Sequence, residues 1–550
     1  MIKNFKLTKG DFFGGLTAGI VALPLALAFG VQSGLGAAAG LYGAIFLGFF
    51  AAVFGGTPSQ ISGPTGPMTV VTASTVAMFA TANGGDISTV IGAIIACFVI
   101  AGLLQIVMGI FKIGSLIKYI PYPVISGFMS GIGIIIILFQ LFKAVGLPSP
   151  ASTIEVVKEI GPALTKINYW ALLYAALTII IIYVFPRITK AIPSTLIALL
   201  AVTGLSIGLE KEVPLIGDIP TGFPEIKIGD IFSIDSKFYS LILEAGATLA
   251  ALGAIDSLLT SVIADNVTKT KHKSNQELIG QGIGNAVGGL FGGLPGAGAT
   301  MRTLVNIRSG GRNKTSGVIH SIVLLIILLG AGKYAALIPQ SVLAGILITV
   351  GIGILDYKSL KHIKKVPVAD AAIMIIVLIV TVFFDLLLAV GIGMVMASIL
   401  FMKQMSDISE ERSKVSDINS LKTEVSWPDE IIPSYIQDNV LVKHLDGPLF
   451  FGFASGFADK ISKLPAIKYV IIRMEKVPFI DQSGLYALEE AILALEQRKI
   501  QVLFTGLQTQ PEDRLRRIRI IPALISEDNL FRTFNDSIQW LVKNKKHELE

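Results

Sequence analysis

The amino-acid sequence predicts a polytopic α-helical membrane protein of fourteen spans, arranged as two inverted repeats of seven, followed by a small α/β domain. Three observations support this fold class. Of the 550 residues, 52% are hydrophobic and only 15% are charged, whereas a soluble chain carries roughly a quarter of its residues as Asp, Glu, Lys and Arg. Long apolar runs recur up to about residue 403. Two sequence patterns also occur in the same order in both halves of this region.

Apolar runs that can cross about 30 Å of hydrocarbon account for twelve of the predicted spans. Two further stretches, 59–80 and 296–309, are interrupted by Pro and Gly and are predicted to be only half-spanning. The twelve longer runs lie near residues 12–33, 35–55, 89–111, 124–142, 168–185, 193–209, 239–263, 276–291, 314–332, 340–355, 369–384 and 386–403.

The distribution of basic residues predicts the orientation, because cytoplasmic loops carry an excess of Lys and Arg. With the N-terminus placed inside, seventeen basic residues fall on the inner side and seven on the outer side, where the loops are longer. This asymmetry favours fourteen crossings in the inner (plasma) membrane, with both termini and the C-terminal domain in the cytoplasm.

The repeated patterns indicate an internal duplication. The run FGGTP at 54–58 matches FGGLP at 291–295, and IPYPVISG at 120–127 matches IPQSVLAG at 338–345. Because seven spans is an odd number, the second copy must be inverted in the membrane. Interrupted spans at corresponding places in the two copies are a sequence indication of a transporter's binding site.

The composition divides the chain into a transmembrane domain at 1–405, a polar linker at 406–436 and a soluble domain at 437–550. In the soluble domain, residues 469–473 and 501–505 are short apolar runs of the kind that form buried strands. Residues 485–497 have helical periodicity. These patterns predict a compact α/β fold.

The two interrupted segments are the strongest candidates for a binding site. In each, a flexible stretch precedes an apolar run, so a helix should begin inside the membrane with free backbone N–H groups. Such an end carries about half a positive charge and suits an anion. Thr65 beside Gly66, and Thr300 beside Ala299, would supply hydroxyls to the substrate. The alternative is that these glycines only permit close packing.

Two charged residues near these segments are functional candidates, because a charge at membrane depth is costly. Arg302 can bind the substrate or pair with Asp256. Asp256 and Thr260 lie four residues apart, so they share one helix face. With backbone carbonyls near Gly298 and Thr300, they can form a sodium site. Asp256 can instead carry a proton, or only neutralise Arg302.

Other features narrow the possible functions. The one cysteine, Cys97, lies in an apolar run, the five histidines are scattered, and no metal-ligand spacing, nucleophile–base pairing or nucleotide-binding glycine motif is evident. The sequence therefore does not indicate an enzyme or a bound cofactor. The formal charge of +6 does not indicate nucleic acid, since the basic residues of the membrane region lie between apolar runs.

The run from Asp481 to Gly484 joins a strand to a helix in the soluble domain. Its side chains are expected either to cap the helix or to form a phosphate or phosphoserine site, because a helix N-terminus favours added negative charge.

These motifs together resemble the SulP family of sulfate-permease-like anion transporters, over nearly the whole chain. The soluble domain is similar to the STAS fold, and its Asp-Gln-Ser-Gly run resembles a phosphorylation loop with Ser483 at the modified position. Within the family, the sequence resembles the sodium-dependent bicarbonate transporters of cyanobacteria. This likeness is carried by ALPLALAFG at 22–30, PTGPMTVV at 64–71, ID at 255–256, LLTSV at 258–262, GQGIGN at 280–285 and GATM at 298–301.

The resemblance implies a core domain that moves against a gate domain, in a homodimer. It also implies anion contacts at Thr65, Ala299 and Thr300, and sodium contacts at Asp256, Thr260, Gly298 and Thr300. Two positions bear on the substrate. Pro24-Leu25 is closer to the bicarbonate transporters than to the Pro-Gln of many sulfate-type members, whereas Arg302 stands where the bicarbonate transporters have glycine and many other members have arginine.

The expected function is secondary active transport of a small inorganic anion by alternating access. The first candidate is bicarbonate with sodium symport. The alternatives are sulfate or a dicarboxylate, coupled to protons or to exchange, and an anion channel.

Overall fold

The computed structural model describes residues 7–549 apart from 151, 190–191, 218–221, 228, 230–233, 385, 413–430, 434–435, 437–438 and 451–466. The chain divides into two compact units, Met1–Ala397 and Ser398–Glu550. Much of the predicted linker, at 413–430, lies outside the described residues.

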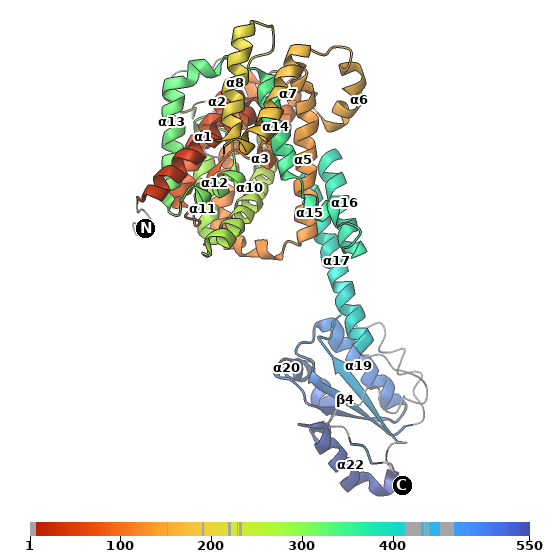
Figure 1. Ribbon diagram of the computed structural model, residues 1–550. Helices are drawn as coiled ribbons and strands as arrows, with labels where there is room; N and C mark the ends of the chain where they lie inside the picture. Colours follow the sequence, from red (N-terminus) through yellow and green to blue (C-terminus); the bar gives the residue numbers. More distant parts are fainter. Residues whose placement is uncertain are drawn as a thin grey trace. The chain divides into compact units, whose positions relative to one another are not determined.

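Within the described part of the chain, a helix lies in each of the fourteen predicted stretches (Figure 1). They are α1 (Lys9–Gln32), α2 (Ala37–Phe54), α3 (Gly66–Ala82), α4 (Ile91–Ile110), α5 (Tyr122–Ala144), α7 (Tyr169–Val184), α8 (Ser194–Leu209), α10 (Tyr239–Thr268), α11 (Ser274–Leu290), α12 (Thr300–Arg308), α13 (Lys314–Ala335), α14 (Gln340–Ile354), α16 (Val368–Phe383) and α17 (Leu386–Arg412). The short helices α6 (Thr153–Ala163) and α15 (Tyr357–Lys361) lie in predicted loops.

The lengths of these helices agree with a polytopic membrane protein. Among the described residues, seven helices are long and apolar enough to cross a bilayer, and five shorter apolar helices accompany them. The two interrupted segments have the shape expected of them: α3 has 17 residues and α12 only nine. Whether all fourteen stretches cross the membrane stays a prediction.

The helices pack in two groups, as the core and gate of the predicted fold would. In the first group α11 packs against α2 and α4, while α13 packs against α1 and α2. In the second, α5 packs against α14 and α16, and α7 packs against α8 and α14. The first group contains both interrupted helices, which lie beside α10 in the middle of the unit in Figure 1. We call these groups the core (α1–α4, α10–α13) and the gate (α5, α7, α8, α14 and α16).

A two-stranded ladder joins the two repeats inside the core. Strand β1 (Ser62–Gly63) pairs antiparallel with β2 (Ala297–Gly298), and each strand comes directly before an interrupted helix. Antiparallel pairing of these equivalent segments agrees with an inverted repeat.

A partly exposed cluster of hydroxyl groups joins α5 of the gate to Asp356, which follows the end of α14. The carboxylate of Asp356 accepts hydrogen bonds from the hydroxyls of Tyr122, Ser126 and Ser359, each at 2.7 Å. Burial raises the pKa of this carboxyl, but the hydrogen bonds from Ser359, Ser126 and Tyr122 outweigh it and lower the pKa from 3.8 to about 2.

Replacing Asp356 with alanine is expected to lower the melting temperature of the purified protein, with a loss on the order of 1 kcal/mol for the donors left without an acceptor. Because the folded pKa lies below the ordinary one, the carboxylate stabilises the fold fully above pH 3.8, and this contribution is lost as pH falls through about 2. The difference in melting temperature between wild type and variant should therefore stay constant between about pH 5 and 8. A difference that shrinks in that range would contradict this account.

The second unit contains a four-stranded parallel sheet in the order β3-β4-β5-β6. Alternate residues of a strand point to opposite faces, and each face is covered by apolar side chains of a different helix. Leu488 and Ile492 of α19 pack with Ile472 and Phe504 on one face, and α22 covers the other. The elements are β3 (Val440–Asp446), β4 (Tyr469–Lys476), α19 (Gln482–Gln497), β5 (Gln501–Thr505), α20 (Thr509–Arg517), α21 (Ile520–Ala523), β6 (Leu530–Phe531) and α22 (Phe534–Leu549). The α/β fold and both predicted strands are confirmed.

The start of α19 has the capping geometry that the sequence indicates. The carboxylate of Asp481 accepts a hydrogen bond from the N–H of Gly484 at 2.7 Å. Ser483 lies in the first turn of the helix with its side chain exposed. The capping interpretation of this run is therefore confirmed for Asp481, and modification of Ser483 stays a prediction.

Candidate functional site

The β1–β2 ladder brings the starts of α3 and α12 together in the core. The N–H of Ala299 donates to the carbonyl of Ile61 at 2.8 Å, and the N–H of Ile61 donates to the hydroxyl of Thr303 at 3.0 Å. The close approach needs glycine: a side chain at Gly296 would lie 2.7 Å from the backbone nitrogen of Pro64. The two helix tips therefore converge, as the sequence predicts.

Both tips leave backbone N–H groups available to a ligand. Neither α3 nor α12, in the described chain, has a side-chain cap at its first turn. Thr65 and Ala299 hold the capping positions, and Gly66 and Thr300 are the first helical residues. Uncapped N–H groups and the helix dipole favour a negative charge at such a position. Thr300 is half-buried and Met301 is 66% exposed, so the tip of α12 is open on one side.

Asp256 and Thr260 of α10 lie against these tips. The carboxylate of Asp256 accepts a hydrogen bond from the hydroxyl of Thr65 at 2.7 Å. One turn further along α10, the hydroxyl of Thr260 donates to the carbonyl of Gly298 at 2.8 Å and lies 2.7 Å from that of Thr300. Asp256 is 7% exposed and Thr260 is fully buried. The residues predicted for the anion and for the cation therefore form one cluster.

Arg302 is buried behind the tips. It is 2% exposed, and its guanidinium donates a hydrogen bond to the carbonyl of Pro64. A side chain at Gly63 would lie 2.6 Å from its Nη1, an atom that has no hydrogen-bond partner among the described residues. Arg302 and Asp256 are thus hydrogen-bonded to different partners, and no direct ion pair joins them among the described residues, so the alternative that Arg302 pairs directly with Asp256 is not seen.

Gly66 places the site at the boundary between core and gate. A side chain at Gly66 would lie 2.8 Å from Ile136 of α5 and 3.1 Å from Ile354 of α14. Both isoleucines belong to the gate, whereas α3 belongs to the core. A solute bound at the tip of α3 would therefore lie next to the surface on which the two groups meet.

The sequence analysis missed a buried carboxylate that holds the chain leading into β1. Glu277 of α11 is 1% exposed, and its two oxygens accept hydrogen bonds at 2.7–2.9 Å from four donors. The donors are the N–H groups of Gly56 and Thr57 and the side-chain amides of Gln60 and Gln281. A glutamate within the predicted span 276–291 was the indication in the sequence, but three of its four partners, Gly56, Thr57 and Gln60, lie more than 200 residues away.

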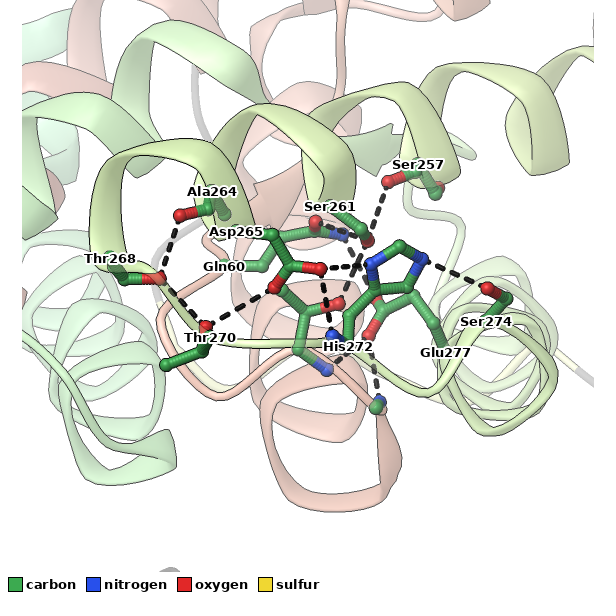
Figure 2. Close-up of polar contacts among 12 residues, drawn as sticks. Gln60, Ser257, Ser261, Ala264, Asp265, Thr268, Thr270, His272, Ser274 and Glu277 are labelled. Carbon is green, nitrogen blue, oxygen red and sulfur yellow. Dashed lines mark hydrogen bonds and ion pairs between the residues drawn. The ribbon is translucent and has the colours of Figure 1, made fainter. Parts of the chain in front are cut away.

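Figure 2 shows how this network reaches α10. The hydroxyl of Ser261 donates to Gln60 at 2.9 Å, and Gln60 in turn donates to Glu277. At the end of α10, the ring of His272 lies between Asp265, at 2.7 Å, and Ser274, at 2.9 Å. Ser274 is the first residue of α11, so these contacts fix the turn that positions Glu277.

Replacing Glu277 with glutamine is expected to lower both the melting temperature and the rate of transport. The new amide group would face two of the four buried donors, and each donor left without an acceptor costs about 1–3 kcal/mol. Thermal unfolding of the purified protein and uptake in proteoliposomes measure the two effects. Glu244→Gln, at an exposed position of α10, is the matched control. Wild-type stability and uptake in Glu277→Gln would contradict a positioning role.

Comparison with known families agrees with this geometry. The sulfate permease family matches residues 8–377. The chain belongs to this family. The STAS domain matches residues 432–537, so the second unit is a STAS domain. The SulP fold expected from the sequence motifs is thereby confirmed.

Individual proteins that are similar to this sulfate permease family member are named as transporters. The chain is 42% identical over 528 residues to the bicarbonate transporter BicA of Picosynechococcus sp., covering 94% of this chain and 92% of BicA. It is similar to the solved transmembrane domain of a cyanobacterial BicA, with 44% identity, a TM-score of 0.65 and coverage of 71% of this chain and 98% of that one. The inward-facing murine Slc26a9 structure matches 99% of this chain and 93% of its own at 19% identity, with a TM-score of 0.83, which shows the shared fold.

These matches confirm a multi-pass membrane anion transporter rather than an enzyme. The structure brings together the predicted residues Thr65, Gly66, Asp256, Thr260, Gly298, Ala299 and Thr300 and places Arg302 behind them. The roles of these residues in binding anion or sodium stay predictions.

Proposed function

We propose that the chain is a secondary active transporter that carries bicarbonate together with sodium. The supporting observation is that Thr65, at the tip of α3, is hydrogen-bonded to the carboxylate of Asp256, while Thr260 and the tip of α12 continue the same cluster. The likeness to BicA over most of the chain favours bicarbonate as the anion.

The cluster provides a physical reason for coupling. The two helix tips attract an anion, but the negative charge of Asp256 opposes one at the same place. A sodium ion held by Asp256, Thr260 and the carbonyl of Gly298 would cancel that repulsion, because hard cations prefer oxygen ligands. Each ion would then raise the affinity for the other by the same factor.

Movement of core against gate would carry the bound ions across the membrane. The site belongs to the core, since α3, α10 and α12 pack there. The gate contributes Ile136 and Ile354 beside Gly66. Sliding of the core past these apolar side chains would expose the tips to one side and then to the other.

A second candidate is transport of sulfate or a dicarboxylate, coupled to protons or to exchange. The observation that favours it is Arg302, a buried cation close to the tip of α3, whose Nη1 has no hydrogen-bond partner within the described part of the chain. A fixed positive charge would compensate a second negative charge on the anion and lessen the need for sodium. An anion channel is the third candidate, and it would not accumulate substrate against a gradient.

Uptake by proteoliposomes tests the proposal. We expect labelled bicarbonate to accumulate when sodium is outside, and uptake to fall when choline replaces sodium. Sulfate, fumarate and succinate should compete weakly. Bicarbonate uptake that does not depend on sodium would overturn the assignment in favour of the second candidate. Strong competition by a divalent anion would have the same consequence. Flux that only dissipates a gradient would indicate a channel.

We also propose that both termini lie in the cytoplasm, as the distribution of basic residues favours, and that the protein forms a homodimer in the inner membrane, as the family resemblance implies. Ser483 would then be accessible to cytoplasmic kinases, because its side chain is exposed in the first turn of α19.

A further inference from the structure

An apolar cavity of about 290 Å³ lies among helices α1, α2, α8 and α13. Leu23 and Leu27 of α1 and Leu41 of α2 line one side, and Thr203 and Gly204 of α8 line another. Ile327 and Tyr334 of α13 are also in its wall. These positions fall in the second halves of α1, α8 and α13 and in the first turns of α2, so they share one end of the unit, the predicted outer side.

The contents of this cavity are restricted by its chemistry and its surroundings. A water molecule takes about 30 Å³ in the liquid, so the space would hold roughly ten, yet an apolar wall offers them few partners. If the space were empty, the side chains that line it would lose dispersion contacts, which would destabilise the packing. Because the wall belongs to membrane-spanning helices, the medium available to fill it is the hydrocarbon of the bilayer.

One polar atom in the wall shows how an occupant would be oriented. The hydroxyl of Thr203 is buried, and it has no hydrogen-bond partner among the described residues. Thr203 lies six residues before the end of α8, which places it about 9 Å below that end at 1.5 Å per residue. Tyr334, which is 70% exposed, lies at the end of α13, where aromatic rings commonly mark the membrane interface.

We propose that this cavity binds one acyl chain of a membrane phospholipid, and that the hydroxyl of Thr203 donates a hydrogen bond to its ester carbonyl. The acyl chain would enter the cavity beside Gly204, since a side chain at that position would meet no atom within 4 Å. It would contact α8 of the gate together with α1, α2 and α13 of the core. A consequence for transport would rest on the proposed movement of core against gate, but binding itself would not.

Photolabelling tests the site in the full-length protein. The protein is reconstituted in nanodiscs that contain phosphatidylcholine with a photoreactive acyl chain, and labelled peptides are identified by mass spectrometry. Wild-type protein should be labelled several times more strongly at residues 199–207 than at the exposed apolar face of α7, which contains Leu172, Leu173 and Ile180. Equal labelling of the two surfaces would overturn the proposal, because that is the level expected of ordinary lipid contact.

Variants separate the site from general effects on the membrane domain. Gly204→Leu should reduce labelling to the level of α7, and Thr203→Val should reduce it severalfold. Gly391→Leu is the matched control, because Gly391 in α17 also has open space around it and should label as wild type. If Gly204→Leu does not fold, Ile327→Trp narrows the cavity from the other wall. Wild-type labelling in a folded cavity variant, or labelling only by a photoreactive free fatty acid, would reject the phospholipid site.

Discussion

Replacing Asp256 with asparagine is expected to abolish the activation of uptake by sodium, a loss of roughly 5- to 150-fold if the coupling has the usual strength. Asparagine has nearly the same shape, and its carbonyl oxygen can still accept the hydrogen bond from Thr65 that the carboxylate accepts at 2.7 Å. The substitution therefore removes the charge that attracts the cation while leaving the contact between α3 and α10. The measurement is initial uptake of labelled bicarbonate over a range of sodium concentrations.

The control for this variant is Glu244→Gln. Glu244 also lies on α10, but its side chain is exposed, so the same change in charge should leave sodium activation unaltered. Melting temperatures of both variants should remain close to that of the wild type. Sodium activation that persists in a folded Asp256→Asn protein would exclude Asp256 as the cation ligand.

Replacing Arg302 with methionine is expected to raise the KM for the anion roughly tenfold or more, since removal of a buried positive charge costs at least the 1.4 kcal/mol that a factor of ten represents. Arg302 is 2% exposed and its guanidinium contacts the carbonyl of Pro64 just before the tip of α3. Methionine is long enough to occupy much of the same space but supplies neither the charge nor the hydrogen bond. The measurement is the dependence of initial uptake on anion concentration at saturating sodium.

Two further variants distinguish an electrostatic role for Arg302 from a structural one. Arg302→Lys keeps the charge but not the planar guanidinium, so it should restore part of the anion affinity. Arg308→Gln, at an exposed position at the end of α12, should behave as wild type. A lower melting temperature and a lower kcat with an unchanged KM in Arg302→Met would show that the residue only supports the fold.

Much of the helical architecture could be predicted because hydrophobicity is a local property. Each apolar run is long enough to form a helix by itself, and the structure has a helix in each of the fourteen predicted stretches. The repeated FGGTP and FGGLP runs correctly marked the two interrupted segments, because Gly and Pro disfavour helix wherever they occur. The apolar strands of the STAS domain were recognisable for the same local reason.

The features that could not be predicted from the sequence are mainly contacts between distant parts of the chain. Glu277 was overlooked because its partners Gly56, Thr57 and Gln60 are more than 200 residues away. The direction of Arg302 could not be deduced either: a buried arginine must find acceptors, but sequence spacing does not show that Pro64 would be one of them. The helix α6 was taken for a loop, since α6 is short and only one of its residues is buried.

The sequence by itself determined that the chain is a membrane protein with two interrupted helices and a C-terminal α/β domain, because apolar length, glycine and proline act on the backbone where they stand. Only the tertiary structure decided that Thr65 contacts Asp256 across 191 residues, that Thr260 reaches the start of α12, and that Arg302 donates to the carbonyl of Pro64. Hydrogen bonds and buried charges depend on distances of a few ångströms between segments, and those distances are set by the packing of the whole core.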